Sequence, residues 1–213
     1  MNTLTLNDIS NKEILNNCIN KLKNGGVGIF PTDTVYGIGC DALNINALNK
    51  LFNYKERNFN KPINILVSNI NMVKKYVKNI NYIEQKLMEN FWPGALTIIF
   101  DKSQIVPNLL TSNLDTVGIR MPNNPISLEL IEYFGSALAT SSANVSNKPA
   151  NININEDLIN NFNNKVNFII DGGEIKDGVP STIVRVDDNK VKILREGAIK
   201  YTEITKVLER EEK

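Results

Sequence analysis

The apolar positions of this 213-residue chain follow two alternating spacings. Segments with apolar residues three and four apart, which is the spacing of one helix face, alternate with short continuous apolar runs typical of buried strands. The first pattern predicts helices over residues 14–22, 45–54, 72–77, 83–91, 128–134 and from about residue 202. The second predicts strands over residues 27–30, 63–67, 96–100, 117–119, 137–140, 168–170, 182–186 and 190–194.

Short polar signals mark where several of these elements begin and end. Ser10-Asn11-Lys12-Glu13 has the form of a helix N-terminal capping box, and Gly25-Gly26 ends the first predicted helix. Asp187-Asp188-Asn189 separates the last two predicted strands, which indicates a hairpin and argues against an all-parallel sheet. Because strands and helices interleave without a linker or repeat, we predict one α/β domain over residues 1–213 with a mixed sheet.

Composition narrows the range of functions. The chain has 24 Lys and Arg residues against 23 Asp and Glu residues, and the net charge of +1 argues against nucleic-acid binding driven by bulk charge. The absence of histidine excludes Ser-His-Asp and Cys-His nucleophile systems and most zinc sites. Cys18 and Cys40 cannot form a disulfide framework and indicate a reducing compartment. With neither a signal-peptide pattern nor an apolar run near the roughly 18 residues of a membrane span, we expect a cytoplasmic protein that does not bind membranes.

The common phosphate-binding motifs are absent from the sequence, since neither G-x-G-x-x-G after a strand nor G-x-x-x-x-G-K-[ST] occurs. Polar and cationic residues instead gather beside predicted strands, at residues 31–37, 55–62, 117–122, 139–144, 180–185 and 195–199. Four of the five arginines lie in or beside these segments, although lysine is the common cation of this chain. A polar turn or a solvated helix end would explain each segment separately. Cations fixed at strand ends could instead converge on one anion, such as a triphosphate.

In their order along the chain, these segments resemble the YrdC/TsaC family of threonylcarbamoyl-AMP synthases. The matching motifs are Thr32–Gly37, Lys55-x-Arg57 with Lys61-Pro62, Trp92-Pro93-Gly94 with Leu96-Thr97, Val117–Pro122, Thr140–Asn144, Ser181–Val184 and Arg195-x-Gly197-Ala198-Ile199. Each motif is weak by itself, but seven motifs in family order are specific. They place a YrdC-like core at about residues 10–200, followed by a charged helix or tail over residues 201–213.

The resemblance implies a YrdC/RibB-like α/β fold, in which helices pack around a twisted open mixed sheet that carries a concave, positively lined cavity. It implies a nucleotidyltransferase that converts L-threonine, bicarbonate or CO2 and ATP into L-threonylcarbamoyladenylate and pyrophosphate. That product serves N6-threonylcarbamoylation of adenosine 37 (t6A) in tRNA. Other proteins of this pathway and tRNA itself are further expected partners. Such chemistry requires positioning and charge neutralisation and needs no histidine.

The resemblance also divides the site between two substrates. Positions that match the family's ATP-binding residues are Lys55, Arg57, Lys61, Thr116, Ser142, Asn144, Ala150 and Arg195. Positions that match its threonine-binding residues are Thr34, Arg120, Thr140 and Ser181. The first three, Lys55, Arg57 and Lys61, would clamp the triphosphate as catalytic residues. Arg120 would bind the threonine carboxylate, and Mg²⁺ would enter with the ATP phosphates rather than on metal-binding side chains.

This chain departs from the family pattern at three places. Leu66 stands where many relatives carry a histidine in the strand after Lys-Pro, so a contact to threonine or to the carbamate is expected to be replaced. The family's S-G-x-P-A stretch reads Ser146-Asn147-Lys148-Pro149-Ala150, and asparagine is the least unfavourable replacement for a glycine at positive φ. A chain ending near residue 213 is also expected to lack the C-terminal domain of the longer members.

Two other functions are compatible with the sequence. One is a YciO-type paralogue whose activity is less certain, against which the intact Lys55-x-Arg57, Ser142-x-Asn144 and Arg195 motifs argue. The other is an RNA- or tRNA-binding module that uses the concave basic face, because a local basic patch would not be visible in the net charge. A carbamoyl-transfer role like that of hydrogenase-maturation proteins fits less well, since those chains carry additional acylphosphatase and zinc-binding domains.

Overall fold

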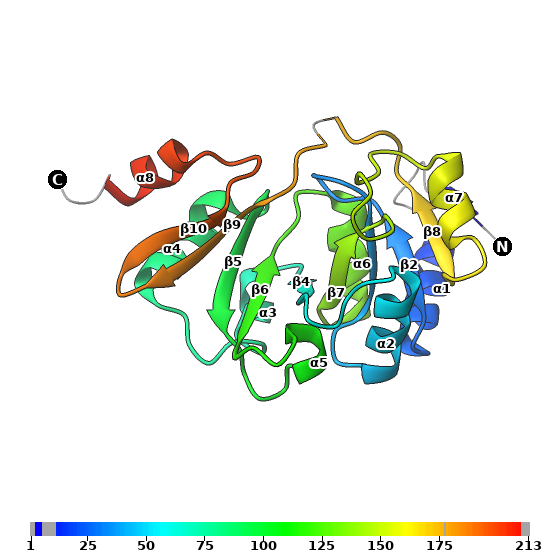
Figure 1. Ribbon diagram of the computed structural model, residues 1–213, viewed down its shortest axis with the longest axis horizontal. Coiled ribbons are helices and arrows are strands. Elements are labelled where there is room, and N and C mark those ends of the chain that lie inside the picture. The colour runs from blue at the N-terminus through cyan, green and yellow to red at the C-terminus, as the bar shows by residue number, and fades with distance from the viewer. Residues whose placement is uncertain (1–2, 6–11, 177, 210–213) are drawn as a thin grey trace.

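The computed structural model describes residues 3–5, 12–176 and 178–209 (Figure 1). Ser10 and Asn11 of the predicted capping box lie outside the described residues, as does Arg210. The helices are α1 (Lys12–Lys23), α2 (Ile45–Tyr54), α3 (Ile70–Val73), α4 (Tyr82–Phe91), α5 (Asn108–Thr111), α6 (Pro125–Phe134), α7 (Glu156–Phe162) and α8 (Tyr201–Glu209). The strands are β1 (Thr3–Thr5), β2 (Val27–Phe30), β3 (Gly37–Asp41), β4 (Asn64–Leu66), β5 (Leu96–Asp101), β6 (Thr116–Arg120), β7 (Leu138–Ser142), β8 (Phe168–Asp171), β9 (Thr182–Asp187) and β10 (Lys190–Arg195).

Within the described residues, the strands form one mixed sheet in the order β1-β8-β2-β3-β7-β4-β6-β5-β9-β10 (Figure 1). β4 runs parallel to β6 and β5 parallel to β9, whereas β7 is antiparallel to both of its neighbours, β3 and β4. The prediction of an α/β fold with a mixed sheet is therefore confirmed. β7, from the second half of the chain, lies between two strands from the first half, so residues distant in sequence meet at the middle of the sheet.

The predicted hairpin is also confirmed. β9 and β10 pair antiparallel, with Lys190 opposite Asp187. The two residues between them, Asp188 and Asn189, have φ angles of 48° and 58°. Positive φ at both central residues is the conformation of a two-residue type I′ turn, which matches the twist of the two strands that it joins. Asp and Asn tolerate this conformation better than most residues with a side chain.

The structure differs from the predicted elements in several places. The sequence pattern does not predict β1, β3, α5 or α7, and the predicted helix over residues 72–77 is limited to α3 and a following turn. β3 has the sequence Gly-Ile-Gly-Cys-Asp, and glycine has a low preference for strands. Gly37 and Gly39 are nevertheless required there, because a Cβ would lie 2.8 Å from Thr140 Cγ2 or 2.7 Å from the Ala139 carbonyl oxygen, respectively.

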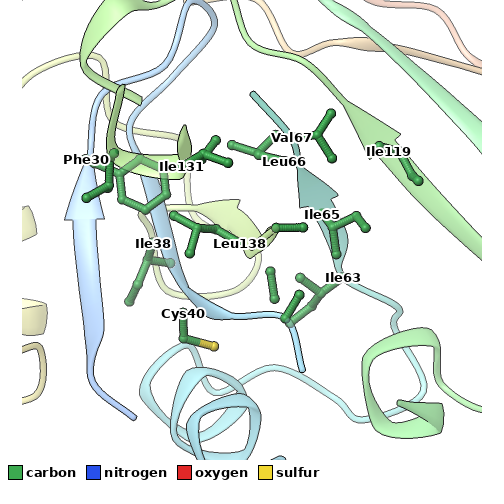
Figure 2. Packing of buried hydrophobic residues seen from close by; sticks show 14 of the residues in the cluster. Phe30, Ile38, Cys40, Ile63, Ile65, Leu66, Val67, Ile119, Ile131 and Leu138 are labelled. Carbon is green, nitrogen blue, oxygen red and sulfur yellow. The ribbon is translucent and has the colours of Figure 1, made fainter. Parts of the chain in front are cut away.

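The hydrophobic core lies against the middle of this sheet. Figure 2 shows buried side chains from β2, β3, β4, β6 and β7 packed together with Ile131 of α6. Phe30, Ile38, Ile65 and Ile119 are each fully buried. Close packing of this kind holds the central strands rigidly, and it therefore fixes the positions of the polar side chains that these strands carry. Among the described residues, no helix is both long and apolar enough to cross a membrane.

Candidate functional site

A cavity of about 240 Å³ lies over the central strands. The register places Asn64 of β4 opposite Thr140 of β7, and Leu66 of β4 opposite Arg120 of β6. Alternate residues of a strand point to the same face, so these four side chains lie on one side of the sheet. All four line the cavity. Its lining is completed by Thr32, Thr34, Val35, Gly37, Arg57, Pro62, Ile63, Thr97, Ser141, Ser142, Ala150, Pro180, Ser181 and Arg195.

The lining is cationic and rich in hydroxyl groups. Arg57, Arg120 and Arg195 all face the cavity, and none of the described residues that line it is acidic. Guanidinium groups present several N–H donors in a planar array that suits carboxylate and phosphate oxygens. The serine and threonine hydroxyls can both donate and accept hydrogen bonds. The cavity therefore suits an anionic ligand that also carries polar groups.

Arg120 is fixed in place by the segment that follows β2. Its Nη1 lies 3.0 Å from Asp33 Oδ1, and its Nη2 donates a hydrogen bond of 3.3 Å to Thr32 Oγ1. Arg120 is only 7% exposed. Burial lowers the pKa of its guanidinium, and the positive charge of Arg195 lowers it further, whereas the negative charge of Asp33 raises it. The ion pair therefore supports a positive charge in a largely buried position, where it can face a ligand carboxylate.

Arg57 approaches the cavity from the segment that follows α2. Its Nε donates to the Lys61 carbonyl at 3.0 Å and its Nη2 to the Pro62 carbonyl at 2.8 Å. The rings of Phe52 and Phe59 stack with centroids 4.9 Å apart, which attaches the same segment to α2. Two of the guanidinium nitrogens are thus used to hold the side chain of Arg57, which lines the cavity. Burial lowers the pKa of Arg57 from its ordinary value.

The third arginine enters from the β10 end of the sheet. Arg195 Nη2 donates to the Ser181 carbonyl oxygen at 2.7 Å. The hydroxyl of Ser181 lies 2.8 Å from that of Thr97 on β5, so these two side chains are joined at the cavity wall. Gly197 packs against this point so closely that a Cβ would lie 2.2 Å from the Pro180 carbonyl oxygen. The glycine of the Arg195-x-Gly197 motif is therefore required for the close approach of the two chain segments.

The end of β7 and the residues that follow it form another wall of the cavity. Ser142 Oγ donates to Asn144 Oδ1, and Asn144 Nδ2 donates to the Lys148 carbonyl oxygen. Asn147 has a φ of 70°, which confirms the prediction that this position needs a residue tolerant of the left-handed region. Ser142 and Ala150 line the cavity, whereas Asn144 is 9% exposed and supports the segment through these hydrogen bonds.

Lys55 has a different environment from the one that the sequence predicts. Its ammonium does not face the cavity but donates to the carbonyl oxygens of Ser142 and Asn144, and to Asn144 Oδ1 at 3.4 Å. The side chain is 1% exposed. Burial lowers the pKa of its ammonium to about 7, and the positive charge of Arg57 contributes in the same direction. A role of Lys55 in binding a triphosphate stays a prediction, and in this structure its ammonium is turned toward the protein's own oxygens.

The structure brings most of the predicted site residues together. Those that line the cavity are Thr34, Arg57, Arg120, Thr140, Ser142, Ala150, Ser181 and Arg195. Lys55, Lys61, Thr116 and Asn144 are outside the lining. Lys61 is exposed, and its own carbonyl oxygen accepts a hydrogen bond from Arg57. Thr116 lies at the opposite end of β6 from Arg120. The binding roles of all these residues stay predictions.

Several residues in or beside the cavity are not among the binding residues that the family resemblance assigns. Thr32 and Asp33 belong to a polar segment that the sequence does single out, but their contact with Arg120 depends on the sheet order. Thr97 belongs to one of the motifs that carry the family resemblance, but the resemblance assigns it no binding role. Asn64 carries no such signal. Its side chain occupies the space over Gly118, where a Cβ would lie 2.2 Å from Asn64 Oδ1.

Comparison with known proteins gives consistent matches. A model of the Sua5/YciO/YrdC family, which bears the description "Telomere recombination", matches residues 20–197. The threonylcarbamoyl-AMP synthase of Pyrococcus abyssi is 37% identical over 88% of this chain, and that of Bacillus subtilis is 35% identical over 88%. This chain spans only 55% and 54% of those two proteins. A putative threonylcarbamoyl-AMP synthase of Methanocaldococcus jannaschii is 38% identical over 91% of this chain and 90% of its own length.

Solved structures give the same assignment. The crystal structure of P. abyssi Sua5 complexed with L-threonine superposes with a TM-score of 0.93 at 33% identity, covering 98% of this chain and 61% of that one. The crystal structure of Escherichia coli YciO has a TM-score of 0.79 at 24% identity, covering 88% and 91% of the two chains, and shows the shared fold. From the family match over most of its length and from these relatives, this chain belongs to the Sua5/YciO/YrdC family.

Proposed function

We propose that this protein is a threonylcarbamoyl-AMP synthase. It takes ATP, L-threonine and bicarbonate or CO2 and releases L-threonylcarbamoyladenylate and pyrophosphate. The proposal rests on the convergence of Arg57, Arg120 and Arg195 on one hydroxyl-rich cavity whose described lining contains no carboxylate. It is supported by the names of the P. abyssi and M. jannaschii relatives and by the L-threonine complexed with P. abyssi Sua5.

The chemistry consists of two bond-forming steps. The unprotonated amine of threonine attacks the carbon of CO2 and loses a proton, which gives a carbamate. A carbamate oxygen then attacks the α-phosphorus of ATP, the bond from that phosphorus to the bridging oxygen of the β-phosphate breaks, and pyrophosphate leaves. Both the attacking group and the leaving group are anions, so the barrier is lowered mainly by positioning and by positive charge.

Each arginine has a place in this scheme. Arg120, the most buried of the three, would bind the threonine carboxylate beside the hydroxyls of Thr34 and Thr140. Arg57 would bind phosphate oxygens through the nitrogen not used by the carbonyls of Lys61 and Pro62. Arg195, which also lines the cavity, would bind the nucleotide. No covalent protein intermediate is required, which suits a chain without histidine.

Mg²⁺ is proposed as a companion of ATP rather than as a protein-held cofactor. Mg²⁺ prefers six oxygen ligands and usually keeps several waters together with substrate phosphates. The described residues contain no cluster of three or more His, Cys, Asp or Glu side chains suited to a metal. The cavity residues would therefore contribute charge and hydrogen bonds, while the phosphates themselves hold the ion.

The proposal is tested by measuring pyrophosphate release from ATP with L-threonine and bicarbonate omitted in turn. We expect release only when both are present, together with a product that has the mass of threonylcarbamoyl-AMP. An Arg57→Ala variant purified in parallel measures the background from enzymes of the expression host. Folded protein that binds ATP but releases no pyrophosphate under any of these conditions would overturn the proposal and favour the YciO-type alternative.

Roles with tRNA and with other t6A-pathway proteins are part of the same proposal. The product is an activated mixed anhydride, so a reaction that transfers the threonylcarbamoyl group to a nucleophile must consume it. A tRNA affinity that falls steeply with salt, without ATP- or threonine-linked thermal stabilisation, would instead indicate an RNA-binding module.

A further inference from the structure

The end of α2 turns Lys55 away from the cavity and Arg57 toward it. Lys55 is the C-cap residue of this helix, and Glu56 follows with a φ of 52°. The amide of Glu56 donates to the Asn53 carbonyl and the amide of Arg57 to the Phe52 carbonyl. This pair of bonds is the Schellman arrangement, which reverses the chain direction at a helix end. The side chains of Lys55 and Arg57, although they belong to one Lys-x-Arg motif, therefore point in different directions.

The side chain of Lys55 contacts residues 142–144, at the end of β7 and just after it, at three oxygens. Its Nζ donates to the carbonyl oxygen of Ser142, to that of Asn144 at 2.6 Å, and to Asn144 Oδ1 at 3.4 Å. A protonated lysine has three N–H donors, so these acceptors match its full capacity. With 1% of the residue exposed, no donor is left for a phosphate oxygen in this arrangement.

The backbone of Lys55 is also hydrogen-bonded to this part of the chain. Its carbonyl oxygen accepts hydrogen bonds from the Ser146 amide at 3.1 Å and from the Ser146 hydroxyl at 3.0 Å. Lys55 therefore connects α2 to residues 142–146 through both its side chain and its backbone. That segment carries Ser142 and leads to Ala150, both of which line the cavity.

We propose that Lys55 is a positioning residue, which holds residues 142–146 in the arrangement that the cavity requires and does not itself contact the triphosphate. The proposal deepens the proposed function, because it assigns charge neutralisation of ATP to the arginines and shaping of the nucleotide site to Lys55. Its first test concerns the ligand-free protein, so its failure and the failure of the synthase proposal can be distinguished.

That test is amide hydrogen exchange in the ligand-free Lys55→Met variant. The Ser146 amide keeps its acceptor in this variant, because the carbonyl of residue 55 remains. If Lys55 positions the segment, exchange at the Ser146 and Asn144 amides should nevertheless accelerate by about 10- to 100-fold, the effect of losing a charge-assisted hydrogen bond. Unchanged exchange at these amides would overturn the proposal.

Lys50→Met is the matched control. Lys50 also lies on α2, and its Nζ also donates to a carbonyl oxygen, that of Gly25 at 2.9 Å. Among the described residues, the side chain of Lys50 makes no hydrogen bond to residues 142–146. We expect exchange at the Ser146 amide to be unaffected in this variant. An equal acceleration in both variants would mean that α2 as a whole, rather than Lys55, controls the segment, and would also overturn the proposal.

A second measurement separates positioning from phosphate binding. Calorimetric dissociation constants for ATP and for AMP are compared between the wild type and Lys55→Met. A positioning role weakens both nucleotides by the same factor, because residues 142–146 are displaced in either case. A larger loss for ATP than for AMP would show direct contact with the β- or γ-phosphate and would overturn the proposal.

Ser146→Ala provides a test if Lys55→Met does not fold. It removes the hydroxyl bond to the Lys55 carbonyl and keeps the lysine. We expect faster exchange at the Asn144 amide, in the same direction as in Lys55→Met but smaller, and equal weakening of ATP and AMP. Wild-type exchange in this variant would contradict the proposed connection between Lys55 and the segment.

Discussion

The guanidinium of Arg120 lies 3.0 Å from the carboxylate of Asp33, with their side chains only 8% and 14% exposed. Arg185 and Asp187 form a second arginine–aspartate pair at 2.6 Å, but their side chains are 36% and 47% exposed. Desolvation is therefore much stronger in the first pair. Removing one member of a buried pair leaves an uncompensated buried charge, whereas an exposed charge is solvated by water.

This contrast predicts different effects on stability. Asp33→Ala should lower the free energy of unfolding by about 3 kcal/mol, because Arg120 keeps its charge in a buried position. Asp187→Ala, the matched control, should lower it by about 1 kcal/mol or less. Urea unfolding of the two variants beside the wild type measures both values. Equal losses would mean that water reaches Arg120 and that the ion pair with Asp33 is not needed to support its charge.

The two substrates should depend on different arginines. Arg57→Ala should abolish ATP-dependent pyrophosphate release and leave the fold intact, because the carbonyl oxygens of Lys61 and Pro62 that it releases are exposed to water. Arg120→Ala should raise the KM for threonine more than that for ATP. Steady-state kinetics with each substrate varied in turn gives both results, and Arg185→Ala, outside the cavity lining, is the control. Equal changes in both KM values for both variants would contradict this division of the cavity.

Asn147 allows a test of the backbone at the edge of the site. Its φ of 70° lies in the left-handed region, where a β-branched side chain is strained. Asn147→Val should destabilise the protein by about 1–2 kcal/mol, whereas Asn147→Gly should change stability by less than about 1 kcal/mol. Lys148→Val, at an adjacent exposed position without a positive φ, is the control. Thermal unfolding compares the variants, and a valine at residue 147 without any cost would show that the segment adopts a different conformation in solution.

Much of the fold could be predicted because local patterns agree with it. The apolar runs at β2, β5 and β6 and the Asp188-Asn189 turn each carry their own signal. β3 could not be predicted in this way. Its two glycines are unfavourable in an isolated strand. The reason for them is the close approach of Ala139 and Thr140, which belong to a strand about a hundred residues later in the chain.

The site shows the same limit. The motifs identify the segments that meet at the cavity, and the clustering of arginines in those segments is visible in the sequence. The sequence does not show where the side chain of Lys55 points, because Lys55 and Arg57 are two residues apart and have the same charge. Only the chain reversal at Glu56 sends one to the carbonyl oxygens of Ser142 and Asn144 and the other to the cavity.

Burial of Lys55 also predicts a pH dependence of stability. Its pKa falls from an ordinary value of 10.5 to about 7 in the folded protein. Below pH 7 both states carry the proton, and between about pH 7 and 10.5 the unfolded state binds it more tightly. Unfolding then takes up a proton, so the stability linked to Lys55 rises with pH across this window, by about 1 kcal/mol between pH 7 and 8.

Urea unfolding of the wild type and of Lys55→Met at pH 6, 7 and 8 isolates this contribution. The pKa values of Cys18, Cys40 and Tyr36 are raised by burial, but these groups are present in both proteins and cancel in the difference. We expect the difference in unfolding free energy to change in favour of the wild type as the pH rises from 7 to 8. Parallel pH profiles would mean that Lys55 keeps an ordinary pKa in the folded protein, with its ammonium stabilised by its three oxygen partners as well as by water.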